Sequence, residues 1–246
     1  MLNLKPAIKH TLMAVAYLST ANCAQAAISL DRTRAIFNGG EKSMTLNVAN
    51  DNKQLPYLAQ AWIENAQQEK ISAGPLVVTP PVQRLDPGAK SMVRLSTTPD
   101  ISRLPQDRES LFYFNLREIP PKSEKPNTLQ IALQTKIKLF YRPAGIQAKP
   151  NAVWQDQLVL YKTAGGYRIE NPTPYYVTVI GLGGTEKAAK EEKFEALMLA
   201  PKSEEHLKAG NYGTPWLSWI DDYGGRPVLQ FTCAGERCTA AKKSSG

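Results

Sequence analysis

The sequence predicts an all-β protein, with an immunoglobulin-like β-sandwich followed by a smaller second β domain. Three observations support this prediction. Short runs in which apolar and polar residues alternate recur between residues 28 and 141, and turn-forming residues separate them. The segment 143–150 contains two prolines and a glycine and has no periodicity, which is typical of an interdomain connector. Further short runs of the same kind resume at residue 158.

Residues 1–26 have the features of a secretory signal peptide. Lys5 and Lys9 give it a positive start, the apolar stretch 11–20 is too short to span a bilayer, and Ala-Gln-Ala at 24–26 is a typical cleavage site. We therefore expect an exported chain that begins at Ala27. A lipoprotein signal that uses Cys23 is the alternative, but Asn22 fits poorly before such a cysteine.

The first domain is expected at residues 27–142 and contains seven candidate strands, a number that fits an immunoglobulin-like sandwich. Turns at 38–40, 50–52, 86–88 and 120–121 are rich in glycine, proline, asparagine and aspartate. The candidate strands lie at residues 28–37, 43–49, 57–64, 76–79, 91–96, 111–119 and 128–141.

The last of these runs, 128–141, is unusually long. Every odd position from Leu129 to Leu139 is apolar except Thr135, so the run reads as one strand. Ordinary strands have about 5–6 residues. Part of this run is therefore expected to serve something other than the core of its own domain.

The second domain is expected at residues 151–246 and is also rich in β-strands. Runs at 158–161 and 167–170 flank a glycine pair as a hairpin, 175–182 is another strand, and 217–220 and 228–233 form a second pair. The segment 186–200 is rich in helix formers and stays open between a helix and a charged loop that leads to a strand near 194–199.

The cysteines and histidines narrow the classes of function. Cys233 and Cys238 are the two cysteines of the exported chain, and an oxidising compartment favours a disulfide between them over two free thiols. His206 is its single histidine, which argues against a histidine-based metal site and leaves one candidate base for a catalytic triad. No phosphate-binding loop or hydrolase motif occurs. We expect no catalytic residues, no metal and no cofactor.

The charge of the chain gives a weak indication of its partners. The formal charge is +8, and loss of Lys5 and Lys9 with the signal peptide lowers it to +6. The lysines are scattered, so the excess reads as a solubilising surface charge, and the plausible anionic partners are carboxylate-bearing proteins or a membrane surface. We expect neither nucleic acid nor a nucleotide as a ligand.

Five segments carry a resemblance to a known family. They are 104–120 (Leu-Pro-Gln-Asp-Arg-Glu-Ser-Leu-Phe-Tyr-Phe-Asn-Leu-Arg-Glu-Ile-Pro), 27–34, 55–62, 167–172 and 222–227. Together they resemble the periplasmic pilus-assembly (fimbrial) chaperones over essentially the whole exported chain. The resemblance implies two immunoglobulin-like domains at an angle, with a cleft between them. It also implies a function: such a chaperone binds, folds and caps pilus subunits by donor-strand complementation and delivers them to the outer-membrane usher.

The resemblance assigns roles to particular residues. It makes 128–141 the lent strand, in which Leu129, Ile131 and Leu133 fill the groove of an incomplete subunit. Arg34 and Lys138 match two basic residues that hold the carboxylate at the C-terminus of the subunit. Strict alternation puts Lys138 and Leu133 on opposite faces of the strand, so we expect a bulge or strong twist between them.

Further residues of the family pattern concern the junction of the two domains and the loop before the lent strand. Glu109, Arg142 and Asp222 match an ionic cluster between the domains. The loop 121–127 is short, as in chaperones of rod-like pili. We expect the free protein to cover its exposed strand, for example by self-association. Two alternatives stay open: a secreted immunoglobulin-like structural or adhesive protein, and a hydrolase or metal-dependent enzyme built on a sandwich.

Overall fold

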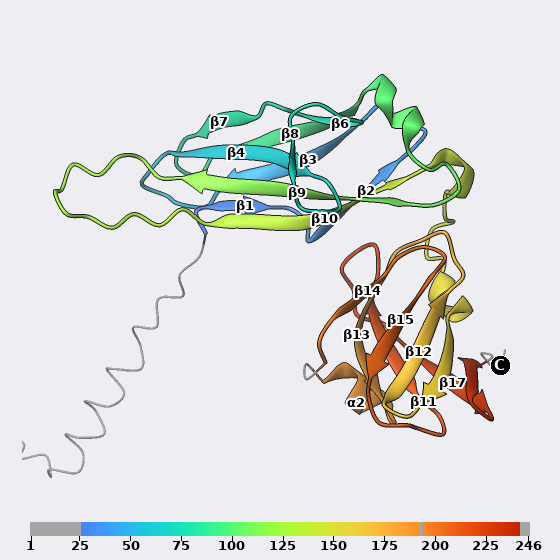
Figure 1. Ribbon diagram of the computed structural model, residues 1–246. Helices are drawn as coiled ribbons and strands as arrows, with labels where there is room; N and C mark the ends of the chain where they lie inside the picture. Colours follow the sequence, from blue (N-terminus) through green and yellow to red (C-terminus); the bar gives the residue numbers. More distant parts are fainter. Residues whose placement is uncertain (1–25, 192–193, 242–246) are drawn as a thin grey trace, which may run out of the picture.

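Strands β1–β10 and strands β11–β18 form two bodies that meet at an angle, as Figure 1 shows. The computed structural model describes residues 26–191 and 194–241. The predicted signal peptide lies outside the described residues except for Ala26. In the part of the chain that is described, no helix has the length and apolar character needed to cross a membrane.

The first body is a sandwich of two sheets. Its smaller sheet has the order β1 (Ile28–Leu30), β3 (Ser43–Asn50), β8 (Lys90–Thr97) and β6 (Leu76–Thr79). The larger sheet has the order β2 (Arg34–Asn38), β10 (Gln134–Arg142), β9 (Ser110–Ile119), β4 (Tyr57–Glu64) and β5 (Lys70–Ile71), and β7 (Val82–Leu85) also pairs with β4. A short helix, η1 (Pro99–Arg103), follows β8.

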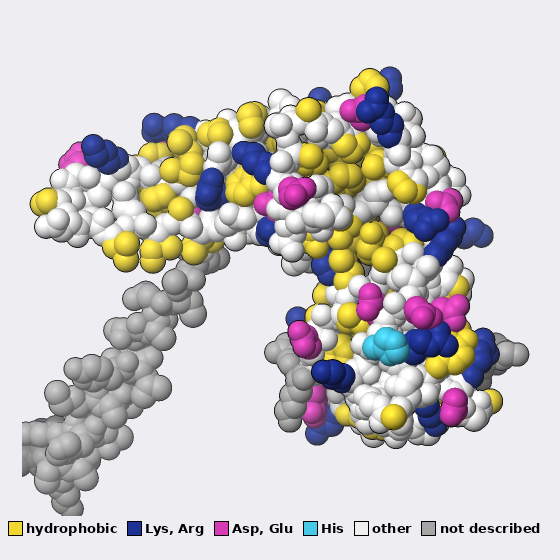
Figure 2. Space-filling model, viewed as in Figure 1, with side chains coloured by type: hydrophobic (Ala, Val, Ile, Leu, Met, Phe, Trp, Pro, Cys, Tyr) yellow, Lys and Arg dark blue, Asp and Glu magenta, His cyan; other side chains and the backbone are white. Residues whose placement is uncertain are grey.

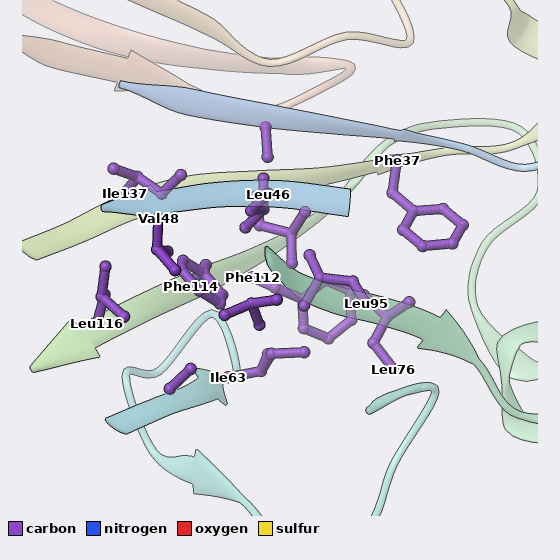
Figure 3. Packing of buried hydrophobic residues seen from close by; sticks show 14 of the residues in the cluster. Phe37, Leu46, Val48, Ile63, Leu76, Leu95, Phe112, Phe114, Leu116 and Ile137 are labelled. Carbon is purple, nitrogen blue, oxygen red and sulfur yellow. The ribbon is translucent and has the colours of Figure 1, made fainter. Parts of the chain in front are cut away.

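Alternating apolar residues from both sheets form the core of this sandwich (Figure 3). Phe37, Leu46, Leu95, Phe114 and Leu139 are completely buried. Each of them comes from a different strand. Successive side chains of a strand point to opposite faces, so each strand turns only one of its faces to the other sheet and to this core.

The second body contains one continuous path of eight strands and its own apolar core. The connector carries a short helix, η2 (Ala144–Ile146), and a second one, η3 (Trp154–Gln157), follows it. The strand order is β14 (Leu197–Leu199), β13 (Val177–Gly183), β16 (Trp216–Ile220), β17 (Val228–Ala234), β18 (Arg237–Ala240), β11 (Val159–Thr163), β12 (Gly166–Asn171) and β15 (Ser203–Lys208).

The predicted fold class, all-β with two immunoglobulin-like domains, is confirmed. The runs 57–64 and 76–79 match β4 and β6 in full, whereas 28–37 divides into β1 and β2 because the chain passes from one sheet to the other between them. The open segment 186–200 contains both alternatives: a short helix α2 (Glu186–Lys190), capped by Thr185, and then strand β14. Strands β5, β7, β15 and β18 were not predicted.

The prediction of one strand over 128–141 is wrong for residues 128–133. Strand β10 begins at Gln134, which pairs with Arg117 of β9. Beyond that point the Glu118 N–H donates to the Leu133 carbonyl at 3.0 Å, and β9 ends at Ile119. Residues 128–133 therefore extend past the end of their neighbour, so they lack the ladder that would define a strand.

Of the two features expected between Leu133 and Lys138, the bulge is wrong and the strong twist stays a prediction. The register between β10 and β9 is regular from Gln134 to Tyr141. Ile137 and Leu139 point into the core, and Lys138 lies on the other face. The two faces of β10 therefore have different roles, and no change of register is needed to separate them.

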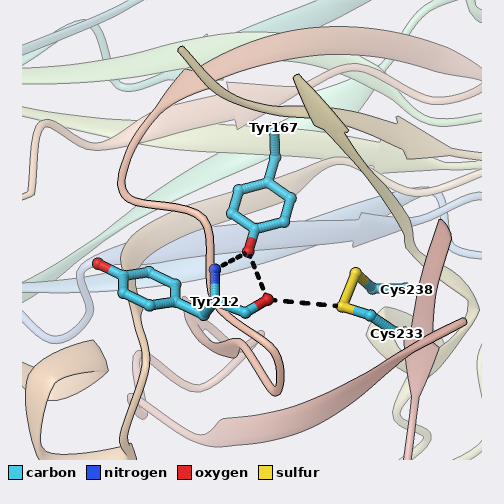
Figure 4. Close-up of a disulfide and its surroundings, with 4 residues drawn as sticks. All are labelled: Tyr167, Tyr212, Cys233 and Cys238. Atoms are coloured by element: carbon cyan, nitrogen blue, oxygen red, sulfur yellow. Dashed lines mark hydrogen bonds between the residues drawn. A yellow bond between two sulfur atoms is a disulfide. The ribbon is translucent and has the colours of Figure 1, made fainter. Parts of the chain in front are cut away.

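The predicted disulfide is present. Cys233 and Cys238 are register partners at the end of the β17–β18 hairpin and are joined by an S–S bond of 1.99 Å (Figure 4). Beside it the buried Tyr167 hydroxyl accepts a hydrogen bond from the Tyr212 N–H at 2.7 Å and donates to the Tyr212 carbonyl at 3.2 Å. These bonds tie the loop before β16 to strand β12.

Candidate functional site

A hairpin projects from the far end of the first domain and carries exposed apolar side chains. It joins β9 to β10 (Figure 1), and Figure 2 shows hydrophobic side chains on the surface of this projection. Leu129 is 86% exposed, Ile131 67% and Leu133 42%. Leu129 is the most exposed large hydrophobic side chain in the described part of the chain. Contiguous apolar surface of this kind marks a site of interaction.

Hydrogen bonds within the projection order it. The Gln130 side chain donates to the Pro121 carbonyl at 2.6 Å, which joins the two arms of the hairpin. The Thr128 hydroxyl donates to the Lys125 carbonyl at 3.0 Å at the tip. The apolar side chains are thus presented by a partly ordered backbone.

One edge of this backbone has no neighbouring strand. Strand β10 has β9 on one side, and on the other side β2 pairs in parallel with residues 138–142 alone. Within the described residues, the remaining part of that edge, 129–137, pairs with nothing. An unpaired edge next to exposed apolar side chains can accept a further strand.

Arg34 and Lys138 lie side by side where the free edge meets β2. They are register partners on the neighbouring strands β2 and β10. Both reach toward the second domain: Arg34 Nη1 donates to the Ile220 carbonyl at 3.1 Å, and Lys138 Nζ donates to the Thr178 hydroxyl at 3.1 Å. Thr178 and Ile220 are themselves register partners on β13 and β16. The two cations therefore lie at the bottom of the angle between the domains.

This pair of cations is poorly compensated. Among the described residues, neither Arg34 nor Lys138 forms an ion pair with a carboxylate, and Arg34 Nε is buried without a hydrogen-bond partner. Burial, and to a smaller extent the charge of Arg34, lowers the pKa of Lys138 to about 8. Burial also lowers the pKa of Arg34, against the opposing effect of nearby Asp222. An incoming carboxylate would relieve both effects, because it adds the missing opposite charge.

The predicted ionic cluster comes together at the junction of the domains. Arg142 Nε donates to Glu109 Oε1 at 2.8 Å, and Arg142 Nη1 donates to Asp222 Oδ2 at 2.8 Å. The Tyr176 N–H of the second domain donates to Glu109 Oε2 at 2.7 Å. Burial raises the pKa of Glu109, while Arg142 lowers it, and the net shift is upward. Ionisation of Glu109 therefore costs part of what the ion pair returns, so the net contribution of the cluster to stability is small.

Aromatic contacts support the same junction. The Arg142 guanidinium lies 5.1 Å from the Trp154 ring and 4.9 Å from the Tyr175 ring. Phe140 of the first domain and Tyr176 of the second have ring centroids 5.4 Å apart. A cavity of ≈ 650 Å³ is lined by residues of both domains and of the connector.

The sequence analysis missed the partners that the second domain provides. Thr178, Ile220 and Tyr176 contact the predicted site residues, but nothing in the local sequence marks them. Their place at the site depends on how the two domains are set against each other, which no pattern along one strand encodes.

Comparisons with known proteins agree with this arrangement. The family model described as "Pili and flagellar-assembly chaperone, PapD N-terminal domain" matches residues 27–147. The family model "Pili assembly chaperone PapD, C-terminal domain" matches residues 153–231. The chain is 72% identical to the chaperone protein PapD of Escherichia coli, over 96% of this chain and 98% of that protein. It is 47% identical to the chaperone protein PmfD of Proteus mirabilis (strain HI4320), over 92% of this chain and 91% of the relative.

Solved structures show the same architecture. The periplasmic chaperone SfaE is similar with a TM-score of 0.68 at 31% identity, over 84% of this chain and all of that one. A structure of the Salmonella enterica SafA pilin in complex with the SafB chaperone gives a TM-score of 0.71 at 27% identity, over 86% of this chain and 98% of the matched chain. Family models that together span nearly all of the described chain, and relatives of this identity and coverage, lead to one conclusion. The chain belongs to the family of pili assembly chaperones.

Proposed function

We propose that this protein is a periplasmic chaperone that binds newly exported pilus subunits, completes their fold with its own strand and delivers them to the outer-membrane usher. The observation that carries the proposal is the exposure of Leu129, Ile131 and Leu133 beside an unpaired backbone edge. A molecule that kept this edge for its own core would bury these side chains, as it buries Ile137 and Leu139 of the same strand.

The lent segment provides affinity in two ways. Its free N–H and C=O groups can form a ladder with a strand of the subunit, which tolerates differences in subunit sequence. Its three apolar side chains enter the groove that the subunit leaves open, and each fully buried Leu or Ile contributes roughly 1.5–3 kcal/mol. The SafB chaperone, to which this chain is similar, was solved in complex with the SafA pilin, which supports a pilus subunit as the partner.

Arg34 and Lys138 fix the position of the subunit along this strand. We propose that they bind the carboxylate at the C-terminus of the subunit through charge-assisted hydrogen bonds. Lys138 lies five positions from Leu133, a distance of about 16 Å along an extended strand. Because a shift by one residue would turn every apolar side chain of the subunit to the wrong face, a fixed end sets the register.

The alternatives are less well supported. A secreted structural or adhesive immunoglobulin-like protein has no need for an uncompensated pair of cations beside a free strand edge. We propose that the protein has no catalytic activity of its own, since the site offers cations, apolar side chains and a backbone edge but no base next to a nucleophile.

The proposal is tested by co-expression with a pilus subunit in a periplasm that lacks other chaperones of the family. Arg34→Ala and Lys138→Ala should each stay folded and retain little or no subunit in a pull-down. Lys90→Ala, which removes an exposed cation from the opposite sheet, is the matched control and should retain the wild-type amount. Wild-type retention by the Arg34 and Lys138 variants would show that the cations do not anchor the subunit.

A further inference from the structure

A buried carboxylate at the end of β9 binds the point where the exported chain is expected to begin. The Glu118 side chain is 6% exposed. Its Oε2 atom accepts a hydrogen bond from the Ala27 nitrogen at 2.7 Å and another from the Ile28 nitrogen at 3.0 Å. Ala27 is also buried, and its carbonyl accepts from the Asp51 N–H at 2.7 Å.

This carboxylate lacks a cationic partner. No lysine or arginine in the described part of the chain forms an ion pair with Glu118. By contrast, the similarly buried Glu64 and Glu109 each have such a partner. Two main-chain N–H groups satisfy one oxygen but bring no net charge. A buried ionised carboxylate without an opposite charge is costly, so a positive group at this point would be strongly favoured.

We propose that removal of the signal peptide creates that positive group. Hydrolysis of the Ala26–Ala27 peptide bond adds the hydroxyl of water to the Ala26 carbonyl carbon and its remaining hydrogen to the Ala27 nitrogen. The new carboxylic acid then transfers its proton to the new amine, which leaves a carboxylate on the released peptide and an α-ammonium on Ala27. That ammonium lies within hydrogen-bond distance of Glu118, so the Ala27–Glu118 ion pair exists in the processed chain alone.

The ion pair stabilises the base of the projecting hairpin. The backbone N–H of Glu118 also donates to the carbonyl of Leu133, the exposed apolar residue that directly precedes β10. Its side chain fixes the start of β1, the edge strand of the smaller sheet. Processing would therefore fasten three segments at one end of the sandwich: β1, the end of β9 and the root of the hairpin. This inference depends on cleavage after Ala26 and not on the proposed function.

Few other ionisable groups face this pair. Strand β1 has none. The ionisable residue next to strand β3 is Asp51, which follows its last residue, Asn50. On β4 it is Tyr57, two residues before Ala59, the register partner of Glu118. On β9 itself, Arg117 is directed to the Gln60 side chain on the other face. The pH dependence of this end of the sandwich should therefore mainly report the terminal amine.

The α-amine provides a direct test. Ionisation of Ala27 is followed by NMR in the exported, processed protein and in Glu118→Gln, without any pilus subunit. An α-amino group has a reference pKa of about 7.7–8.0. We expect the pKa in the wild type to lie about one to two units above that reference, and to fall back to it in the variant. An equal pKa in both proteins, or an N-terminus other than Ala27 by mass spectrometry, would overturn the proposal.

A second variant covers the case in which Glu118→Gln fails to fold. Insertion of Gly-Ser between residues 26 and 27 leaves Glu118 intact but moves the ammonium away after cleavage. An amine whose pKa is higher in the folded state than in the unfolded state stabilises the fold while it is protonated, and this contribution is lost as the pH rises through the folded-state pKa. The wild type should therefore lose stability as the pH rises from 7 to 10. At pH 7 its folding equilibrium constant should exceed that of the insertion variant by about ten- to a hundredfold, and the difference should vanish at pH 10. Equal stability at both pH values would overturn the proposal.

Discussion

Replacement of Ile131 by alanine should weaken subunit binding and leave the free protein as stable as before. Ile131 is 67% exposed, so its side chain contributes little to the fold, and we expect a change of less than about 0.5 kcal/mol in the free energy of unfolding. Burial of that exposed fraction against a subunit should contribute about 1–2 kcal/mol, from a full value of roughly 1.5–3 kcal/mol. The dissociation constant for a subunit should therefore rise by about 5- to 30-fold.

Ile137→Ala is the matched control. Ile137 comes from the same run of alternating residues, but it is 5% exposed and belongs to the core of the first domain. Its replacement should lower the free energy of unfolding by about 2–5 kcal/mol. Urea unfolding measures stability, and titration with a pilus subunit measures affinity. Equal losses of stability in both variants, with no loss of affinity in Ile131→Ala, would refute the assignment of 129–133 to the partner.

Three further predictions concern the two cations, the junction of the domains and the second domain. The free Lys138 has a pKa of about 8, and a bound carboxylate raises it, so the affinity for a subunit should be highest below pH 8 and fall by up to about tenfold per pH unit above it. Lys138→Arg should remove this pH dependence in the same binding assay. An unchanged pH profile in that variant would contradict the role of Lys138. Glu109→Ala should cost about 3 kcal/mol in urea unfolding, since it removes a partner of Arg142 and the acceptor of the Tyr176 N–H; a cost below about 1 kcal/mol would show that the cluster is not needed. Tyr167→Phe should destabilise the protein by about 1–3 kcal/mol, because both main-chain groups of Tyr212 lose their partner; no change in the urea midpoint would contradict this.

The strands were predictable from the sequence wherever one face of a sheet is buried and the other is not. The run at 57–64 shows this, since its alternation follows the burial of Ala59, Ala61 and Ile63. Strand β15 (Ser203–Lys208) was missed because it is a polar edge strand with a single buried side chain, Leu207. Its place in the sheet comes from pairing with β12, which the local sequence does not show.

In the long run 128–141 the sequence pattern and the structure differ. Alternation continues through 129–139, yet the ladder to β9 stops at Leu133, because β9 ends at Ile119. A pattern shows which side chains need burial but not which molecule buries them. The resemblance assigned Leu129 and Ile131 to the groove of a subunit, and the structure shows that both side chains are exposed.

The site was predictable as far as its residues lie on matched motifs. Arg34 and Lys138 were named from the resemblance, and the structure makes them register partners. Their contacts with Ile220 and Thr178 depend on the angle between two domains, so they were beyond the reach of the sequence.

The measurement that tests the central claim most directly is a crystal structure of the protein with a pilus subunit. The account predicts that a strand of the subunit pairs with residues 129–137, that Leu129, Ile131 and Leu133 are buried in the subunit, and that its terminal carboxylate lies between Arg34 and Lys138. A complex in which these three side chains stay exposed, with the subunit bound at another surface, would contradict it.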